Sequence, residues 1–203
     1  MTPSLDPERA LRAIPGPDSL PDIGPAAAQA GLLDVSYAID DFPVGRLLLA
    51  ATPQGLVRLA YLDHSDEDAV LAHLATHVSP RILASAGPLD EPRRELEEYF
   101  SGARRQFDMP LDWRLVRGFG RRVLEATARV PFGSVTTYKQ MATEAGSPRA
   151  SRAAGNALGA NPIPIIVPCH RVLHATGGLG GYTGGLDRKR LLLGLEGQQT
   201  LTT

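Results

Sequence analysis

Three consecutive segments that begin just after residue 32 have a strand-like pattern of apolar residues. The segments are residues 33–39, 45–52 and 55–62, and this spacing is typical of β-strands. The intervening residues 40–43 and 53–54 carry Asp and Pro or Pro and Gln, which are plausible hairpin connections. The pattern therefore predicts a sheet built on consecutive hairpins.

The next segments have helical spacing. Ser65 is the expected N-cap of a first helix, because acidic residues follow it at the positive end of the helix dipole. A second helix is predicted over residues 89–100, ending at Gly102, and then a short strand over residues 106–111. The apolar stripe of the first helix is Val70, Leu71, Leu74 and Val78. The carboxylates Glu95, Glu97 and Glu98 are expected to form a solvated face of the second.

The C-terminal part of the chain is predicted to be mainly helical. One helix is expected over residues 119–130, and Thr137 should cap another that starts at Tyr138. Ser147 and Pro148 provide an N-cap followed by proline in the first helical position of a third helix. Two helices joined by a tight turn that contains glycine form a helix-turn-helix.

Composition and charge divide the chain unevenly. Residues 1–32 hold six prolines and no sustained period, so we expect an irregular extension with one short helix over residues 8–13. Residues 33–115 form the predicted α/β domain and residues 116–203 the helical domain. Residues 1–116 carry 10 Lys and Arg against 18 Asp and Glu, whereas residues 117–203 carry 11 against 4. A basic C-terminal half suits a polyanion, although two oppositely charged halves could simply attract each other.

Other classes of protein are disfavoured. No apolar run approaches the roughly 18 residues that span a bilayer, and the N-terminus lacks the features of a secretory signal. One cysteine among 203 residues permits no internal disulfide, and five scattered histidines show no metal-ligand spacing. We therefore expect a cytoplasmic protein without a membrane partner, a bound metal or a cofactor.

Cys169 lies in the most unusual segment of the chain. Pro162, Pro164 and Pro168 fix three backbone φ angles and remove three donors, so this apolar approach to the cysteine is expected to be extended, stiff and buried. A lone cysteine is commonly a small core residue. However, His170 and the following arginine would favour the nucleophilic thiolate.

The run Pro168-Cys169-His170-Arg171-Val172 resembles the active-site signature of the O6-alkylguanine-DNA alkyltransferases, also called methylated-DNA–protein-cysteine methyltransferases. The resemblance continues in residues 151–162, which are similar to the recognition helix and asparagine hinge of that family. It also includes residues 181–186 and 191–196, and it is dense from about residue 119 to residue 197. The resemblance implies a ribonuclease-H-like α/β domain, followed by a mainly α domain with a winged helix-turn-helix.

The resemblance assigns chemical roles to individual positions. It implies that Cys169 accepts an alkyl group and that Glu196 orients His170, which activates the thiol through a bridging water. Asn161 holds the turn, while Tyr138 rotates the nucleotide and assists the leaving guanine. The product would be a stable thioether, so each molecule would react once.

The resemblance also implies which residues contact substrate and DNA. The partner is double-stranded DNA carrying O6-alkylguanine, bound by a monomer that could cluster along the duplex. Arg152, 17 residues before the cysteine, would fill the space of the flipped base. Tyr182 would line the substrate pocket, Thr183 would offer a backbone N–H to the guanine oxygen, and the Val172 carbonyl would accept from the exocyclic amine. The predicted DNA-binding residues are Arg152, Tyr138, Lys139, Ser147 and Arg149.

Two departures from the family pattern and two alternative functions remain open. Gly120 and Leu124 stand where many relatives have glutamine and tryptophan, which could alter helix packing or a phosphate contact. A lesion sensor that binds without transferring is one alternative, although such sensors lack the nucleophile present at Cys169. A thiol hydrolase is the other, and it would turn over repeatedly.

Overall fold

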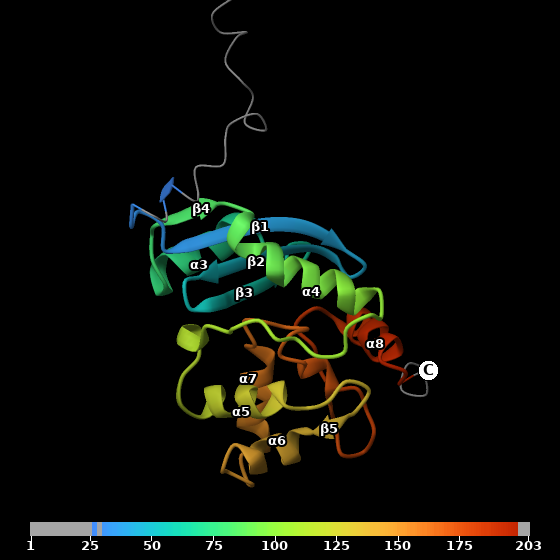
Figure 1. Ribbon diagram of the computed structural model, residues 1–203. Coiled ribbons are helices and arrows are strands. Elements are labelled where there is room, and N and C mark those ends of the chain that lie inside the picture. The colour runs from blue at the N-terminus through green and yellow to red at the C-terminus, as the bar shows by residue number, and fades with distance from the viewer. Residues whose placement is uncertain (1–25, 28–29, 199–203) are drawn as a thin grey trace, which may run out of the picture.

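The computed structural model describes residues 26, 27 and 30–198 and contains an α/β unit and a helical unit in contact (Figure 1). Most of the predicted Pro-rich extension lies outside the described residues, as does the helix expected over residues 8–13. The predicted architecture, an α/β domain followed by a mainly helical domain, is confirmed.

The N-terminal unit is built on a four-stranded sheet with the order β3-β2-β1-β4. Strands β1 (Val35–Phe42), β2 (Gly45–Thr52) and β3 (Gly55–Tyr61) form antiparallel hairpins. The three predicted strands are therefore confirmed, but residues 40–42 belong to β1, and the first turn is only residues 43 and 44. Strand β4 (Ile82–Ala84), which the sequence pattern missed, pairs parallel to β1.

Strand β2 is buried on both faces because it is central and a helix covers each side of the sheet. Leu47 and Leu49 belong to the core shared with α4 (Asp90–Phe100), which follows the 3-10 turn η2 (Gly87–Leu89). Leu48 packs in a second cluster with α3 (Glu67–His77). A strand buried on both faces reads as a continuous apolar run, as residues 47–51 do.

Three details of the N-terminal prediction are wrong. The N-cap of α3 is Asp66 rather than Ser65, and it makes no side-chain capping bond. Glu95 is buried rather than solvated, because its carboxylate accepts from the Asp108 backbone N–H at 2.9 Å and lies 3.5 Å from Arg104 Nη1. Residues 106–111 form no extended strand, and only Leu111 makes a bridge, to Leu56.

The C-terminal unit packs α5, α6 and α7 together, and α8 lies beside the N-terminal unit in Figure 1. Thr137 caps α6 as predicted, with its hydroxyl 3.2 Å from the Gln140 backbone N–H. The elements are η3 (Trp113–Leu115), α5 (Gly118–Ala128), β5 (Thr136–Thr137), α6 (Tyr138–Glu144), α7 (Ser151–Gly159), η4 (Cys169–Arg171), β6 (Val172–Leu173) and α8 (Leu186–Leu195).

Helix α7 begins at Ser151, three residues after the predicted start at Pro148. Residues 147–150 instead form a turn, closed by the Ala150 N–H donating to the Ser147 carbonyl at 2.9 Å. Consequently Arg149 lies in the turn and does not share a helical face with Arg152.

The two departures from the family pattern, Gly120 and Leu124, lie in α5. An added Cβ at Gly120 would lie 3.7 Å from Ala157, which is ordinary van der Waals contact, so close approach of α5 and α7 does not require this glycine. Leu124 is fully buried. Gly155 of α7 faces the Tyr138 ring, which an added Cβ would meet at 3.6 Å.

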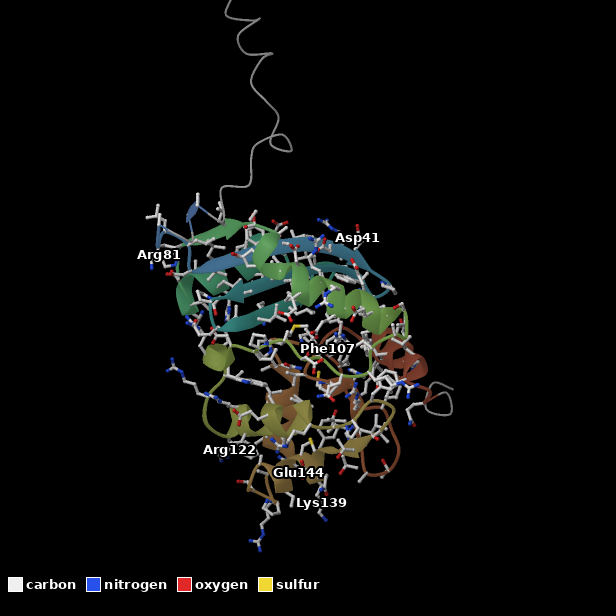
Figure 2. All side chains as sticks on the ribbon, viewed as in Figure 1. Asp41, Arg81, Phe107, Arg122, Lys139 and Glu144 are labelled. Atoms are coloured by element: carbon white, nitrogen blue, oxygen red, sulfur yellow. The ribbon has the colours of Figure 1, made fainter. Side chains whose placement is uncertain are left out.

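Residues between the two units complete one continuous core. Phe107 lies where the two units meet (Figure 2) and packs against that core. The Leu59 N–H of β3 donates to the Pro162 carbonyl at 2.9 Å, which ties the sheet to the segment before Cys169. Within the described residues, no helix is long and apolar enough to cross a membrane.

Candidate active site

The segment before Cys169 is a tight buried turn rather than the extended approach predicted from its prolines. Ile165 has a φ of 74°, which is rare for a β-branched residue, and the Val167 N–H donates to the Ile163 carbonyl at 2.9 Å. Asn161 closes this turn, since its side-chain oxygen accepts from Ile163 N and its Nδ2 donates to the Val167 carbonyl at 2.8 Å. The same Nδ2 lies 3.2 Å from Cys169 Sγ.

Cys169 is 5% exposed and opens into a cavity of about 640 Å³. The sulfur is therefore buried but not sealed from solvent, and helix α7 with Arg152 forms part of the cavity wall. The lining residues are Tyr138, Ser151, Arg152, Gly155, Asn156, Leu158, Gly159, Cys169, His174, Gly181, Tyr182 and Thr183.

The thiol is not stabilised as a thiolate by its sequence neighbours. Burial raises the pKa of Cys169 to about 11, and the Asn161 amide and the Lys189 charge only partly oppose that effect. The expectation that His170 and Arg171 favour the thiolate is wrong, because both side chains are directed to Glu196. The thiol therefore needs a base during reaction.

His170 and Glu196 are in direct contact. His170 Nε2 lies 2.9 Å from Glu196 Oε1, and both side chains are fully buried. Because Nε2 faces a carboxylate, we assign the proton to Nε2, which leaves Nδ1 as the acceptor nitrogen. His170 Nδ1 is buried and has no hydrogen-bond partner among the described residues.

Glu196 is held as an anion by several donors. Burial by itself raises its pKa, but hydrogen bonds from His170 and Arg171 lower the net pKa to about 2. Arg171 donates from Nε to Oε2 and from Nη2 to Oε1, each at 2.8 Å, and the Tyr99 hydroxyl donates to Oε1 at 2.7 Å. Burial lowers the pKa of His170, so the imidazole is neutral and able to accept a proton.

The predicted substrate residues lie around the cavity, with one exception. Tyr138, Tyr182 and Thr183 line it, and the Thr183 hydroxyl donates to the Gly159 carbonyl at 3.0 Å. Val172 is fully buried and is not among the described residues that line the cavity. Its carbonyl already accepts from Lys189 Nζ at 2.7 Å.

Comparison with known proteins identifies the class of site. Residues 35–113 match the family described as 6-O-methylguanine DNA methyltransferase, ribonuclease-like domain. Residues 118–198 match its DNA binding domain. The methylated-DNA–protein-cysteine methyltransferase of Mycobacterium tuberculosis is 42% identical over 164 residues, which cover 80% of this chain and 92% of the relative. The chain belongs to the methylated-DNA–protein-cysteine methyltransferase family.

Other members of this methyltransferase family are also similar. The human protein of the same name is 36% identical over 165 residues, covering 78% of this chain and 79% of the relative. The crystal structure of Mycobacterium tuberculosis O6-methylguanine methyltransferase has a TM-score of 0.69 at 39% identity, covering 81% and 94% of the two chains. A structure of the Mycobacterium tuberculosis protein in complex with DNA has a TM-score of 0.68 at 39% identity, covering 80% and 93%.

The DNA-binding residues predicted from the methyltransferase family are distributed over one end of the molecule. Arg152 is exposed at the cavity, while Lys139 is exposed in the first turn of α6 and projects from the helical end in Figure 2. Arg149 is exposed and Ser147 is half-buried in the turn before α7, and neither lines the cavity. Their roles in binding remain predictions.

Four site residues were missed by sequence reasoning. Arg171 and Tyr99 hold Glu196, and Lys189 is a wholly buried lysine whose Nζ donates to the carbonyls of Val172, Leu179 and Gly181. Tyr61 contacts Tyr182. Only Arg171 had a signal, since it is part of the signature run, whereas the others depend on contacts between distant segments.

Lys189 lies on α8, whose N-cap is Gly185. Asp187, in the first turn of α8, pairs with Arg190 at 3.0 Å. In the part of the chain that the structure describes, no group of three or more metal-ligating side chains is found. Cys169, His170 and Glu196 supply a thiol, a base that could deprotonate it and a carboxylate that orients the base, which is the set of groups that nucleophilic chemistry needs.

Proposed function

We propose that this protein repairs DNA by direct reversal, transferring the alkyl group of O6-alkylguanine irreversibly to Cys169. The observation that carries the proposal is the position of a single thiol at a cavity beside the exposed arginine of a helix-turn-helix. Membership of the methyltransferase family supports the same reaction. The proposed catalytic residues are Cys169, His170, Glu196, Asn161 and Tyr138.

In the proposed reaction, the Cys169 thiol proton passes to His170 Nδ1, directly or through a bridging water. The resulting imidazolium is stabilised by the Glu196 carboxylate 2.9 Å from Nε2. The sulfur attacks the alkyl carbon, the carbon–O6 bond breaks, and its electron pair remains on guanine. A proton from Tyr138 or solvent then neutralises the guanine, and a thioether remains on Cys169.

The depth of the thiol explains why base flipping is proposed. Cys169 is only 5% exposed, so its sulfur cannot reach O6 while guanine is stacked in a duplex. Flipping the nucleotide costs a few kcal/mol, and less for a damaged base. We propose that Arg152 occupies the vacated space, and that Tyr138, Lys139, Ser147 and Arg149 contact the phosphate backbone. Tyr182 and the Thr183 backbone N–H would recognise the base. The Val172 carbonyl would take part only through the lone pair that Lys189 Nζ leaves free.

Intact-mass measurement after incubation with alkylated duplex tests this proposal. Wild-type protein should gain one alkyl mass per molecule and then stop, because a thioether offers no good leaving group. Cys169→Ser should gain none while still binding the duplex, and Ser101→Ala, an exposed change outside the cavity, serves as the folded control. Repeated turnover would indicate a hydrolase, and binding without mass gain would indicate a sensor.

Two finer statements belong to the same proposal. We expect one molecule to act on each lesion, since the described cavity is formed by a single chain. A reducing compartment such as the cytoplasm would keep the Cys169 thiol available for reaction.

A further inference from the structure

The wall of the cavity beside Cys169 is supported by the N-terminal domain. Tyr61, the last residue of β3, is only 3% exposed and has its hydroxyl oxygen 2.8 Å from that of Tyr182. The two rings meet edge to face, with centroids 6.3 Å apart. Tyr182 lines the cavity, whereas Tyr61 does not, so the hydroxyl contact connects Tyr61 to the cavity through Tyr182.

Tyr182 connects this support to the reacting groups. Its ring lies edge to face with His170, with centroids 6.3 Å apart. A displacement of Tyr182 would therefore change both the width of the cavity and the packing of the imidazole.

Arg188 makes a second contact with Tyr61. The Arg188 guanidinium lies 4.6 Å from the centre of the Tyr61 ring, which is within cation–π range. Arg188 also donates to the Val44 carbonyl at 2.5 Å and to the Gly184 carbonyl at 2.9 Å, and it pairs with Asp63. This one side chain thus ties the N-terminal sheet to the glycine loop that carries Tyr182.

Gly184 shows how closely the two rings are packed. An added Cβ would lie 2.6 Å from Tyr61 and 2.9 Å from Tyr182, distances that real Cβ atoms essentially never show. The Tyr61 and Tyr182 rings and the Gly184 peptide are therefore tightly packed. Tyr182 cannot move toward the sheet without losing its hydroxyl contact with Tyr61.

We propose that Tyr61 is a positioning residue that fixes Tyr182 and thereby limits the size of the alkyl group that the cavity accepts. This inference rests on the proposed alkyl transfer. It gives the ribonuclease-like domain a direct part in substrate selection, although that domain contributes none of the residues that line the cavity within the described chain.

The test compares single-turnover transfer of methyl and benzyl groups from duplexes of identical sequence, measured by intact mass. In Tyr61→Phe, methyl transfer should slow about three- to tenfold, the range expected for one lost hydrogen bond. The benzyl-to-methyl rate ratio should rise, because a mobile wall admits the larger group. Tyr37→Phe is the matched control, since Tyr37 packs in the other core cluster of the same domain.

A double-mutant cycle separates positioning from general stability. Tyr182→Phe removes the other hydroxyl of the same bond, so the double variant should be no slower than the slower single variant, within about twofold. Gly184→Ala should instead lower the benzyl-to-methyl ratio, because the added Cβ would push Tyr182 toward the cavity, while Gly87→Ala, with no atom within 4 Å of the added Cβ, should leave the ratio unchanged.

Three outcomes would overturn the inference. Tyr61→Phe could match Tyr37→Phe on both substrates, or it could slow both transfers equally in step with a lower Tm. The rate loss of the double variant could also equal the product of the rate losses of Tyr61→Phe and Tyr182→Phe, which would mean that the two hydroxyl groups act independently. Absence of any alkyl mass gain by wild-type protein would instead reject the proposed function, and the inference with it.

Discussion

At the scale of single residues, the site depends on one buried carboxylate. Glu196 is 5% exposed and accepts from His170, Tyr99 and two nitrogens of Arg171, in addition to the Gly133 N–H at 3.2 Å. An anion in this position is stable only because those donors replace water. It orients the imidazole, and it also holds together residues from both domains.

Glu196→Gln should lower stability most near neutral pH. The pKa of Glu196 is lowered to about 2, so its ionisation contributes stability above its ordinary pKa that is lost as pH falls through about 2. The contribution is on the order of 3 kcal/mol, and the variant also leaves the Arg171 guanidinium without its counter-ion.

Urea unfolding at about pH 7 and about pH 2.5 measures this effect. The difference in unfolding free energy between wild type and Glu196→Gln should narrow at the lower pH. Glu97→Gln, an exposed change on α4, is the control, and its unfolding free energy should differ little from that of wild type at either pH. An equal deficit for Glu196→Gln at both pH values would contradict the assigned ionisation.

At the scale of elements, α7 exposes Arg152 beside the cavity while its opposite face packs on the helical unit. Ala154 and Leu158 are buried, whereas Arg152 and Asn156 are exposed beside the cavity. Ala153 is also exposed, so the buried stripe of α7 is narrow. The helix can thus approach a duplex without disturbing its own core.

Arg152→Ala should slow repair in duplex DNA without affecting the thiol. Loss of the side chain that we propose fills the space of the flipped base should reduce transfer from an alkylated duplex at least about tenfold. Transfer from free O6-benzylguanine, which needs no flipping, should remain near the wild-type rate. Arg94→Ala, an exposed arginine on α4, is the control for loss of positive charge. Equal losses on the duplex and the free base would place Arg152 in the chemical step.

At the scale of the whole molecule, charge is divided between the two domains. Residues 1–116 have a net charge of −8 and residues 117–203 a net charge of +7. Figure 2 shows Arg122 and Lys139 in the helical half, and Arg81 and Asp41 in the sheet half. The sheet half would repel a phosphate backbone, so the charge distribution orients the helical end toward DNA.

Duplex binding should weaken steeply as salt rises, because Lys and Arg contacts release counter-ions from the phosphates. Lys139→Gln should reduce the slope of log affinity against log salt by about one, for damaged and undamaged duplex alike. Arg94→Gln, in the N-terminal domain, should leave the slope unchanged. A change restricted to damaged DNA would show that Lys139 reads the lesion rather than the backbone.

The local features of this protein could be predicted from its amino-acid order alone. Short strand-like runs between turn residues located β1, β2 and β3, apolar spacing located α3 and α4, and the Thr137 hydroxyl fixed the start of α6. These features depend on residues within a few positions of one another, so a local pattern contains the necessary information. The signature run at Cys169 located the nucleophile for the same reason.

The surroundings of that nucleophile depend instead on how the folded chain brings distant segments together. Glu95 is buried because a loop 13 residues later satisfies its carboxylate, and the Cys169 pKa rises because distant segments remove water from the sulfur. Tyr61 meets Tyr182 across 121 residues, and Tyr99 meets Glu196 across 97. Burial and hydrogen bonding between such residues arise only when the two domains pack together, because neither segment alone specifies which partner it will meet.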